Sequence, residues 1–338
     1  MLALLVVAPL LKPGYLLLRD AVSTPRSFLS DTARGLMAAP RATPQDFAVA
    51  LASHVVDGGI VVKTLLVLGL WLGGWGAARL VATALPEAEG GGEFVAITLA
   101  IWNPYVAERL LQGHWSLLVG YGCLPWVAAT MLALRADGGG RRDFVGLAFW
   151  IALAGLTPTG LLLAATVALV CVAVPGAGRP RWLCGAATFG FALVGALPWL
   201  MASALGSSHL VGGTTHTAGN GLGVDAFAPR AEPGLGTLGS LASLGGVWNA
   251  AAVPGSRTTL FAVLSAVVLL GVVAAGLPAV ARRRAVLPLL ALAGISVLVP
   301  ALLATGPGLQ VLRAVVDAVP GCGVLRDGQK WVALAVPG

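Results

Sequence analysis

Long apolar runs dominate this chain and constrain its fold more than any other feature. A helix needs about 20 apolar residues to cross the hydrocarbon core of a bilayer. The 338 residues are 57% hydrophobic and only 10% charged, whereas soluble domains carry about 25% charged residues. Too little polar surface remains to cover a water-soluble globule. The sequence therefore predicts an all-α, polytopic bundle of transmembrane helices in a multi-pass protein of the cell membrane.

The apolar runs predict about nine spans in a single transmembrane domain that covers residues 1–338. Lys12-Pro13-Gly14 interrupts the first run, and the third, fifth and sixth runs are short. The expected spans cover residues 2–18, 60–85, 94–106, 115–134, 144–156, 160–175, 182–205, 260–280 and 285–304. One more apolar run, "WVALAVPG", stops at Gly338, so we expect a C-terminal truncation just inside a further helix.

Arginine clusters in short loops indicate how the spans are oriented. With nine spans, three such loops fall on one side, which the positive-inside rule makes cytoplasmic. These loops carry Arg135, Arg141 and Arg142, then Arg179 and Arg181, then Arg282, Arg283 and Arg284. The outer side then receives a first loop over 19–59, expected to hold an interfacial helix after Ser30-Asp31-Thr32, the turn over 108–114, and a Gly/Ser/Thr-rich loop over 206–259. The Gly, Ser and Thr residues over 207–234 of this last loop predict a flexible or loosely folded segment.

The distribution of charge and the spacing of the cysteines indicate which partners and ligands the chain binds. The net charge is +7, but the arginines lie in short clusters between apolar runs, which indicates a lipid bilayer as partner and no nucleic acid. The four cysteines are far apart and lack metal-ligand spacing, so we expect free thiols. We expect no metal and no cofactor, although the sequence leaves a divalent ion open.

A polar cluster interrupts the apolar pattern within "AIWNPYVAERLLQGHWSLLVGYGCLPW", residues 100–126. Asn103-Pro104 predicts the end of a helix. The candidate site residues that follow are Glu108, Arg109, Gln112, His114 and Trp115. An arginine can bind a phosphate with two parallel hydrogen bonds, and interfacial aromatics can stack on a sugar or anchor a helix. The alternative is an ordinary outer turn with interfacial aromatics.

Two further stretches place charged residues next to apolar runs. Arg19 and Asp20 stand where the first expected span ends, and Asp20 is a candidate general base. The alternative is an interfacial ion pair that only ends the span. In "LRDGQKW", Arg326, Asp327 and Lys330 precede Trp331. Arg326 and Lys330 are candidates to bind a phosphate or pyrophosphate. The alternative there is the charged flank of one more span.

The order of several motifs resembles that of a group of actinobacterial multi-spanning membrane proteins. These motifs are "LLRDAVSTP", "APRATPQD", "GWGAARL", "WNPYVAERLLQGHWSLLVGYGCLPW" and "LRDGQKW". The group is similar to the GT-C type glycosyltransferases, which use polyprenyl-phosphate sugars. The resemblance implies a catalytic acidic residue in the first outer loop, and Asp20 occupies that place. The paired acidic pattern of that family is absent, because Arg19 and Ala21 flank Asp20.

The function implied by the resemblance is inverting sugar transfer at the outer membrane face. The donor is a polyprenyl-phosphate sugar, and the acceptor is a glycan or glycolipid of the cell envelope. Asp20 is the expected catalytic residue, and the expected substrate-binding residues are Arg19, Glu108, Arg109, Gln112, His114, Trp115, Arg326, Asp327 and Lys330. A transporter or flippase of lipid-linked glycans and a non-catalytic envelope-assembly scaffold are the alternatives.

Overall fold

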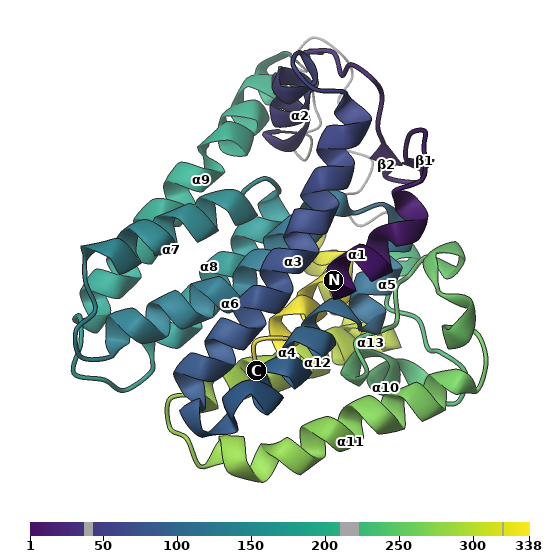
Figure 1. Cartoon of the computed structure of the whole chain (residues 1–338). Coiled ribbons are helices and arrows are strands. Elements are labelled where there is room, and N and C mark those ends of the chain that lie inside the picture. Colours follow the sequence, from purple (N-terminus) through teal and green to yellow (C-terminus); the bar gives the residue numbers. More distant parts are fainter. Residues whose placement is uncertain (37–42, 210–222, 320) are drawn as a thin grey trace. The chain divides into compact units, whose positions relative to one another are not determined.

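Thirteen α-helices make up most of this computed structural model, which describes residues 1–36, 43–209, 223–319 and 321–338 (Figure 1). The chain divides into two compact units. One contains Met1–Trp102 and Gln112–Thr215, and the other contains Asn103–Leu111 and His216–Gly338. The all-α class is confirmed, and its one described departure is a ribbon of two short strands, β1 (Leu17–Leu18) and β2 (Ala21–Val22).

Within the described ranges, four helices are long and apolar enough to cross a membrane. They lie in α3 (Gly58–Ala84), α6 (Trp115–Arg135), α9 (Arg181–His209) and α11 (Phe261–Ala281). A pair bent by 96°, α12 (Leu287–Leu303) and α13 (Gly306–Ala318), raises the number to five if the pair is one broken span. The membrane class is thereby supported by length and composition, and the count of nine spans is not confirmed.

Helix α6 is the central helix of the first unit, with 83% of its most apolar window buried. It runs parallel to α3, because Gly69 of α3 meets Val119, and Gly73 meets Gly122. A β-carbon added to Gly122 would lie 2.2 Å from the Gly69 carbonyl oxygen. Small residues let helix backbones approach this closely, so α6 packs on the side of α3 that carries Gly69 and Gly73. Figure 1 shows the two helices.

Besides α1 and α2, the first unit contains four more helices that pack around α3 and α6. These are α4 (Glu89–Ile101), α7 (Arg141–Ala154), α8 (Pro158–Val172) and α9. α4 packs against α3, where Ile101 fills the space beside Gly74. α8 packs against α6, where Gly160 meets Gly120, and α9 packs on α8 through Gly195 and Leu161. Glycine contacts thus recur at each of these crossings.

Two of the short arginine-containing loops lie at one end of this first unit. Arg135 and Arg179 meet at one end, where the Arg179 amide donates to the Leu134 carbonyl over 2.8 Å. The opposite end holds the starts of the parallel helices α3 and α6, next to Asp57 and His114. Two of the three arginine loops used to orient the chain therefore share one end, and the candidate residue His114 lies at the other.

The first predicted span differs from the structure. Residues 2–18 form a six-residue helix, α1 (Leu2–Val7), a short 3-10 helix (Ala8–Leu10) and then strand β1. Proline and glycine in the Lys12-Pro13-Gly14 segment oppose a continuous helix. The helix expected after Ser30-Asp31-Thr32 is only a turn, and the helix of this loop is α2 (Gln45–Ser53).

The second unit contains α5 (Pro104–Gln112) up to Leu111, α10 (Gly236–Ala242), α11, α12 and α13. Only 6% of the apolar window of α11 is buried. Residues 210–222 of the predicted 206–259 loop lie outside the described residues. The remainder is folded rather than loose, with Val224, Leu241 and Val247 fully buried. The run predicted to begin a further span is instead a 3-10 helix, η9 (Gly328–Ala335), packed on α12.

Candidate functional site

Asp20 stands at the tip of the β1–β2 hairpin. Leu17 pairs with Val22 and Leu18 with Ala21, so Arg19 and Asp20 form a two-residue connection. Arg19 has a φ of 54°, a conformation that glycine usually supplies in such turns. A non-glycine residue held in the left-handed region costs free energy and often occurs at functional sites.

The segment from Gln112 to His114 fixes the orientation of Asp20. The Asp20 amide donates to the Gln112 carbonyl over 3.1 Å. The Gln112 side-chain amide donates to Asp20 Oδ2 over 3.0 Å, and His114 Nε2 lies 2.7 Å from the same oxygen. Gly113 allows this approach, since its β-carbon would lie 2.4 Å from the Ala21 nitrogen. Three of the predicted site residues, Asp20, Gln112 and His114, are therefore brought together.

This Asp–His pair remains accessible. The Asp20 side chain is 47% exposed and the His114 side chain 16% exposed. An accessible carboxylate that is held by hydrogen bonds has the geometry of a general base. Trp115, the first residue of α6, is buried instead, so its ring does not form an open stacking surface beside the pair.

The other predicted residues of α5 enter a separate, buried network in the second unit. Arg109 is fully buried and donates to both carboxylate oxygens of Asp327, over 2.9 and 3.1 Å, and to the Gln329 amide oxygen. Its guanidinium also lies over the Tyr105 ring at 5.4 Å. Arg109 is thus engaged by protein groups, in an arrangement typical of a structural ion pair.

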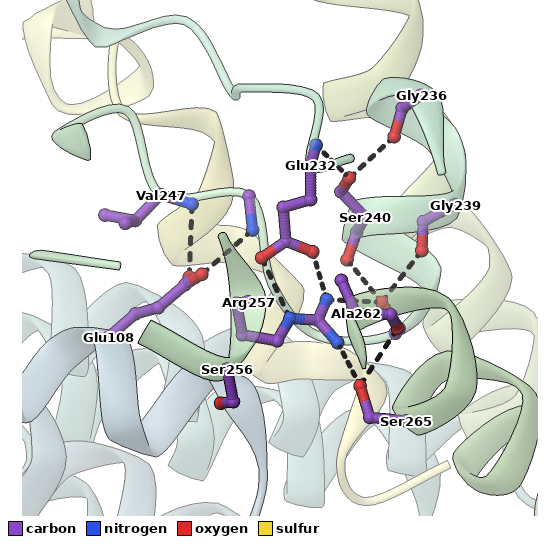
Figure 2. A network of polar contacts seen from close by, with 12 residues as sticks. Glu108, Glu232, Gly236, Gly239, Ser240, Val247, Ser256, Arg257, Ala262 and Ser265 are labelled. Carbon is purple, nitrogen blue, oxygen red and sulfur yellow. Dashed lines mark hydrogen bonds and ion pairs between the residues drawn. The ribbon is translucent and has the colours of Figure 1, made fainter. Parts of the chain in front are cut away.

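Glu108 joins the same network from the next position of α5. Its carboxylate accepts from the Gly246 and Val247 amides over 3.2 and 3.1 Å and from the Gln329 amide over 3.1 Å. Burial and the nearby Glu232 carboxylate raise the pKa of Glu108 to about 8. The carboxyl group therefore holds the 246–247 turn, as Figure 2 shows.

A second buried ion pair lies beside Glu108 (Figure 2). Arg257 donates to both oxygens of Glu232, to the Ser243 hydroxyl over 2.8 Å and to the Ser265 hydroxyl over 2.9 Å. Neither Glu232 nor Arg257 is among the site residues predicted from the sequence. The sequence shows only that these two residues have opposite charges within a segment that was predicted to be a loop. Opposite charge does not distinguish an ion pair in solvent from a buried one.

The remaining predicted residues lie near the end of the chain. Lys330 Nζ is 3.8 Å from Asp327 Oδ2, and the Tyr105 hydroxyl donates to the Lys330 carbonyl over 3.2 Å. Arg326 packs over the Phe227 ring at 5.6 Å and donates to the Gly323 carbonyl. These three charged side chains and Arg109 belong to the second unit, whereas Asp20 and His114 belong to the first.

The described residues contain no cluster of three or more His, Cys, Asp or Glu side chains suited to a metal ion. All four cysteines are free thiols, as predicted. No protein-family model, curated protein or solved structure matches this chain.

Proposed function

We propose that this chain is a membrane glycosyltransferase whose reaction centre is the Asp20–His114 pair. The donor is a sugar on a polyprenyl phosphate, and the acceptor is a glycan or glycolipid of the envelope. The arginine-rich end of the first unit faces the cytoplasm of a cell membrane, and the hairpin end meets the outer interface. The observation that carries the proposal is the orientation of a half-exposed Asp20 by His114 and Gln112.

In the proposed step Asp20 takes the proton of an acceptor hydroxyl. The hydroxyl oxygen bonds to the anomeric carbon, the bond from that carbon to the lipid phosphate oxygen breaks, and its electron pair leaves with the phosphate. Inversion at the anomeric carbon follows from attack opposite the leaving group. The hydrogen bonds to Asp20 Oδ2 fix the direction of the carboxyl group toward its substrate.

The leaving phosphate needs positive charge close to Asp20. Arg19 adjoins Asp20 in the hairpin and can supply this charge. One such electrostatic contact to developing charge is commonly worth about 2.7–4 kcal/mol. We assign this role to Arg19 rather than to Arg109, because Asp327 and Gln329 already engage the Arg109 guanidinium.

The test is sugar transfer from a synthetic polyprenyl-phosphate sugar by purified protein in lipid vesicles. Asp20→Asn keeps the side-chain size but cannot accept the proton, so transfer should fall by about 10²–10⁴-fold, with donor binding retained. Asp31→Asn, an exposed aspartate of the same loop, is the matched control and should transfer normally. Normal transfer by Asp20→Asn would exclude the role of Asp20. A wild-type protein that binds no donor and transfers no sugar would favour the alternative function of a non-catalytic envelope-assembly scaffold.

A further inference from the structure

Positive charge gathers at the end of the first unit where α7 and α9 begin. The two aspartates of this region, Asp137 and Asp143, are outnumbered by five arginines over 135–143 and 174–182, namely Arg135, Arg141, Arg142, Arg179 and Arg181. The two segments touch, because Arg179 Nε donates to the Gly139 carbonyl over 2.8 Å. The starts of α7 and α9 therefore share a local excess of positive charge.

Two of these arginines already bind protein groups. Arg135 is buried, and its guanidinium donates to carbonyls of the segment over 174–179. Arg179 uses its Nε to fix the two segments against each other. The acceptors of both guanidinium groups are backbone carbonyls, so these contacts do not neutralise the positive charge of this region.

The guanidinium groups of Arg141 and Arg142 are free to bind a ligand. Both side chains are exposed, and neither has a hydrogen-bond or ion-pair partner in the part of the chain that the structure describes. Arg181 is also exposed, and only its Nη2 is engaged, by the Ala173 carbonyl over 3.2 Å. All three belong to the first turn of α7 or α9, where positive charge is unfavourable for a helix. The stability of these helices thus does not explain the three residues, which we call the arginine patch.

The exposed faces of α7 and α9 become apolar directly after the arginine patch. On α7, Val145 and Phe149 follow Arg142 at helical spacing and are exposed. On α9, Trp182 and Phe189 are exposed, and only 17% of the apolar window of this helix is buried. Exposed tryptophans are typical of the level of the lipid headgroups. The arginine patch therefore has the place of a headgroup contact, with the apolar faces beside the lipid chains.

We infer that the arginine patch binds the phosphate of an anionic glycerophospholipid whose acyl chains lie along the exposed faces of α7 and α9. A guanidinium can donate two parallel hydrogen bonds to a phosphate. The apolar faces match acyl chains, which a free phosphate lacks, and the excess of arginine opposes a headgroup with its own cation. Basic residues next to a membrane span attract anionic lipids in this way. This site is separate from the proposed transfer at Asp20, at the opposite end of the unit.

The experiment uses the purified full chain in phosphatidylcholine nanodiscs with a small fraction of phosphatidylglycerol that carries a diazirine in its acyl chain. After irradiation, mass spectrometry should find the labelled residues within 141–153 and 181–193. The double variant Arg141→Gln, Arg142→Gln should label less, by about 5-fold for each arginine lost. Labelling elsewhere, or unchanged labelling of the double variant, would overturn the inference.

A charge-matched control shows whether the effect is local. Arg282→Gln with Arg284→Gln removes two exposed arginines from another predicted cytoplasmic loop and should leave the labelling unchanged. Asp137→Asn removes an exposed carboxylate beside the arginine patch and should raise labelling, by up to about 5-fold. All these variants should keep the wild-type thermal midpoint, because the substituted side chains are exposed.

A comparison of probes tests the class of ligand. A phosphatidylcholine probe with the same diazirine should label these residues about 5-fold less than the phosphatidylglycerol probe. Equal labelling by the two probes, or an equal loss of labelling in the Arg282 and Arg284 control, would contradict an anionic-lipid site at the arginine patch. Displacement of the phosphatidylglycerol probe by millimolar inorganic phosphate would show a site for a free anion instead.

Discussion

A left-handed backbone at Arg19 brings Asp20 to the tip of a hairpin that glycine would form more easily. The Asp20 carboxylate then meets His114 and Gln112, which approach from a turn that Gly113 makes possible. A structural ion pair would not need an unfavourable φ, whereas a reacting group does need a fixed direction. At the scale of single residues, the hairpin therefore reads as a device for presenting Asp20.

Glu108 should make the stability of the protein depend on pH. Its folded pKa of about 8 lies above the ordinary 4.5, so the folded state holds more protons than the unfolded state between these values. The stability from this group is complete below about pH 4.5 and is lost as pH rises through about 8. Thermal unfolding in detergent should thus show a midpoint that falls over this range. Glu108→Gln should reduce the fall of the thermal midpoint with rising pH. Glu93→Gln, on α4, should show the same fall as the wild-type protein. An unchanged slope in Glu108→Gln would disprove the assignment.

Arg109 should be needed for stability rather than for donor binding. Removing one partner of a buried ion pair typically costs about 3–5 kcal/mol, so Arg109→Gln should lower the thermal midpoint strongly. Arg313→Gln removes the exposed contact to Asp225 and should change the midpoint little. A stable Arg109→Gln protein that had lost only donor binding would show that the predicted phosphate role is correct.

At the scale of elements, glycines decide how α3 and α6 meet. Gly122→Ala places a methyl group against the Gly69 carbonyl, and overpacking of this kind costs typically about 1–3 kcal/mol. Its thermal midpoint should fall. Gly190→Ala, on α9 with open space around it, is the control and should be neutral or stabilising. Equal midpoints for both variants would argue against close α3–α6 packing.

The helices differ in how well the sequence predicts them. Apolar runs of full length, such as 60–85 and 115–134, predicted α3 and α6 closely, because length and composition alone determine such helices. The span predicted over 2–18 is not one helix, because Pro13 and Gly14 interrupt the apolar run. The segment 223–259 was misjudged, since its buried groups are satisfied by distant partners such as Glu108. Local composition carries no record of those contacts.

The candidate site could be predicted only in part for the same reason. The spacing of Gln112 and His114 marked one polar turn, and its contact with Asp20 spans more than ninety positions. The sequence grouped Arg109 with His114 because they are close along the chain. In the structure, Arg109 binds Asp327 within the second unit, while His114 immediately precedes α6 in the first unit and contacts Asp20. Residues that are close along the chain therefore need not belong to the same site.

At the scale of the whole molecule, the orientation in the membrane can be measured directly. Val55 and Gly138 belong to opposite ends of the first unit and are both exposed. In a variant with Cys322→Ser, a cysteine at Val55 should react with an impermeant maleimide on intact cells. A cysteine at Gly138 should react only after permeabilisation. Reaction of both from outside would contradict the proposed topology.

The most direct test of the account is a double-mutant comparison of sugar transfer by Asp20→Asn, His114→Gln and the two together. If Asp20 and His114 act as one unit, the double variant should lose about as much activity as Asp20→Asn alone, because residues of one unit are strongly non-additive. All three proteins should keep the wild-type thermal midpoint and still bind the polyprenyl-phosphate donor. Losses that multiply would show independent roles, and transfer at the wild-type rate by the double variant would contradict the proposed reaction centre.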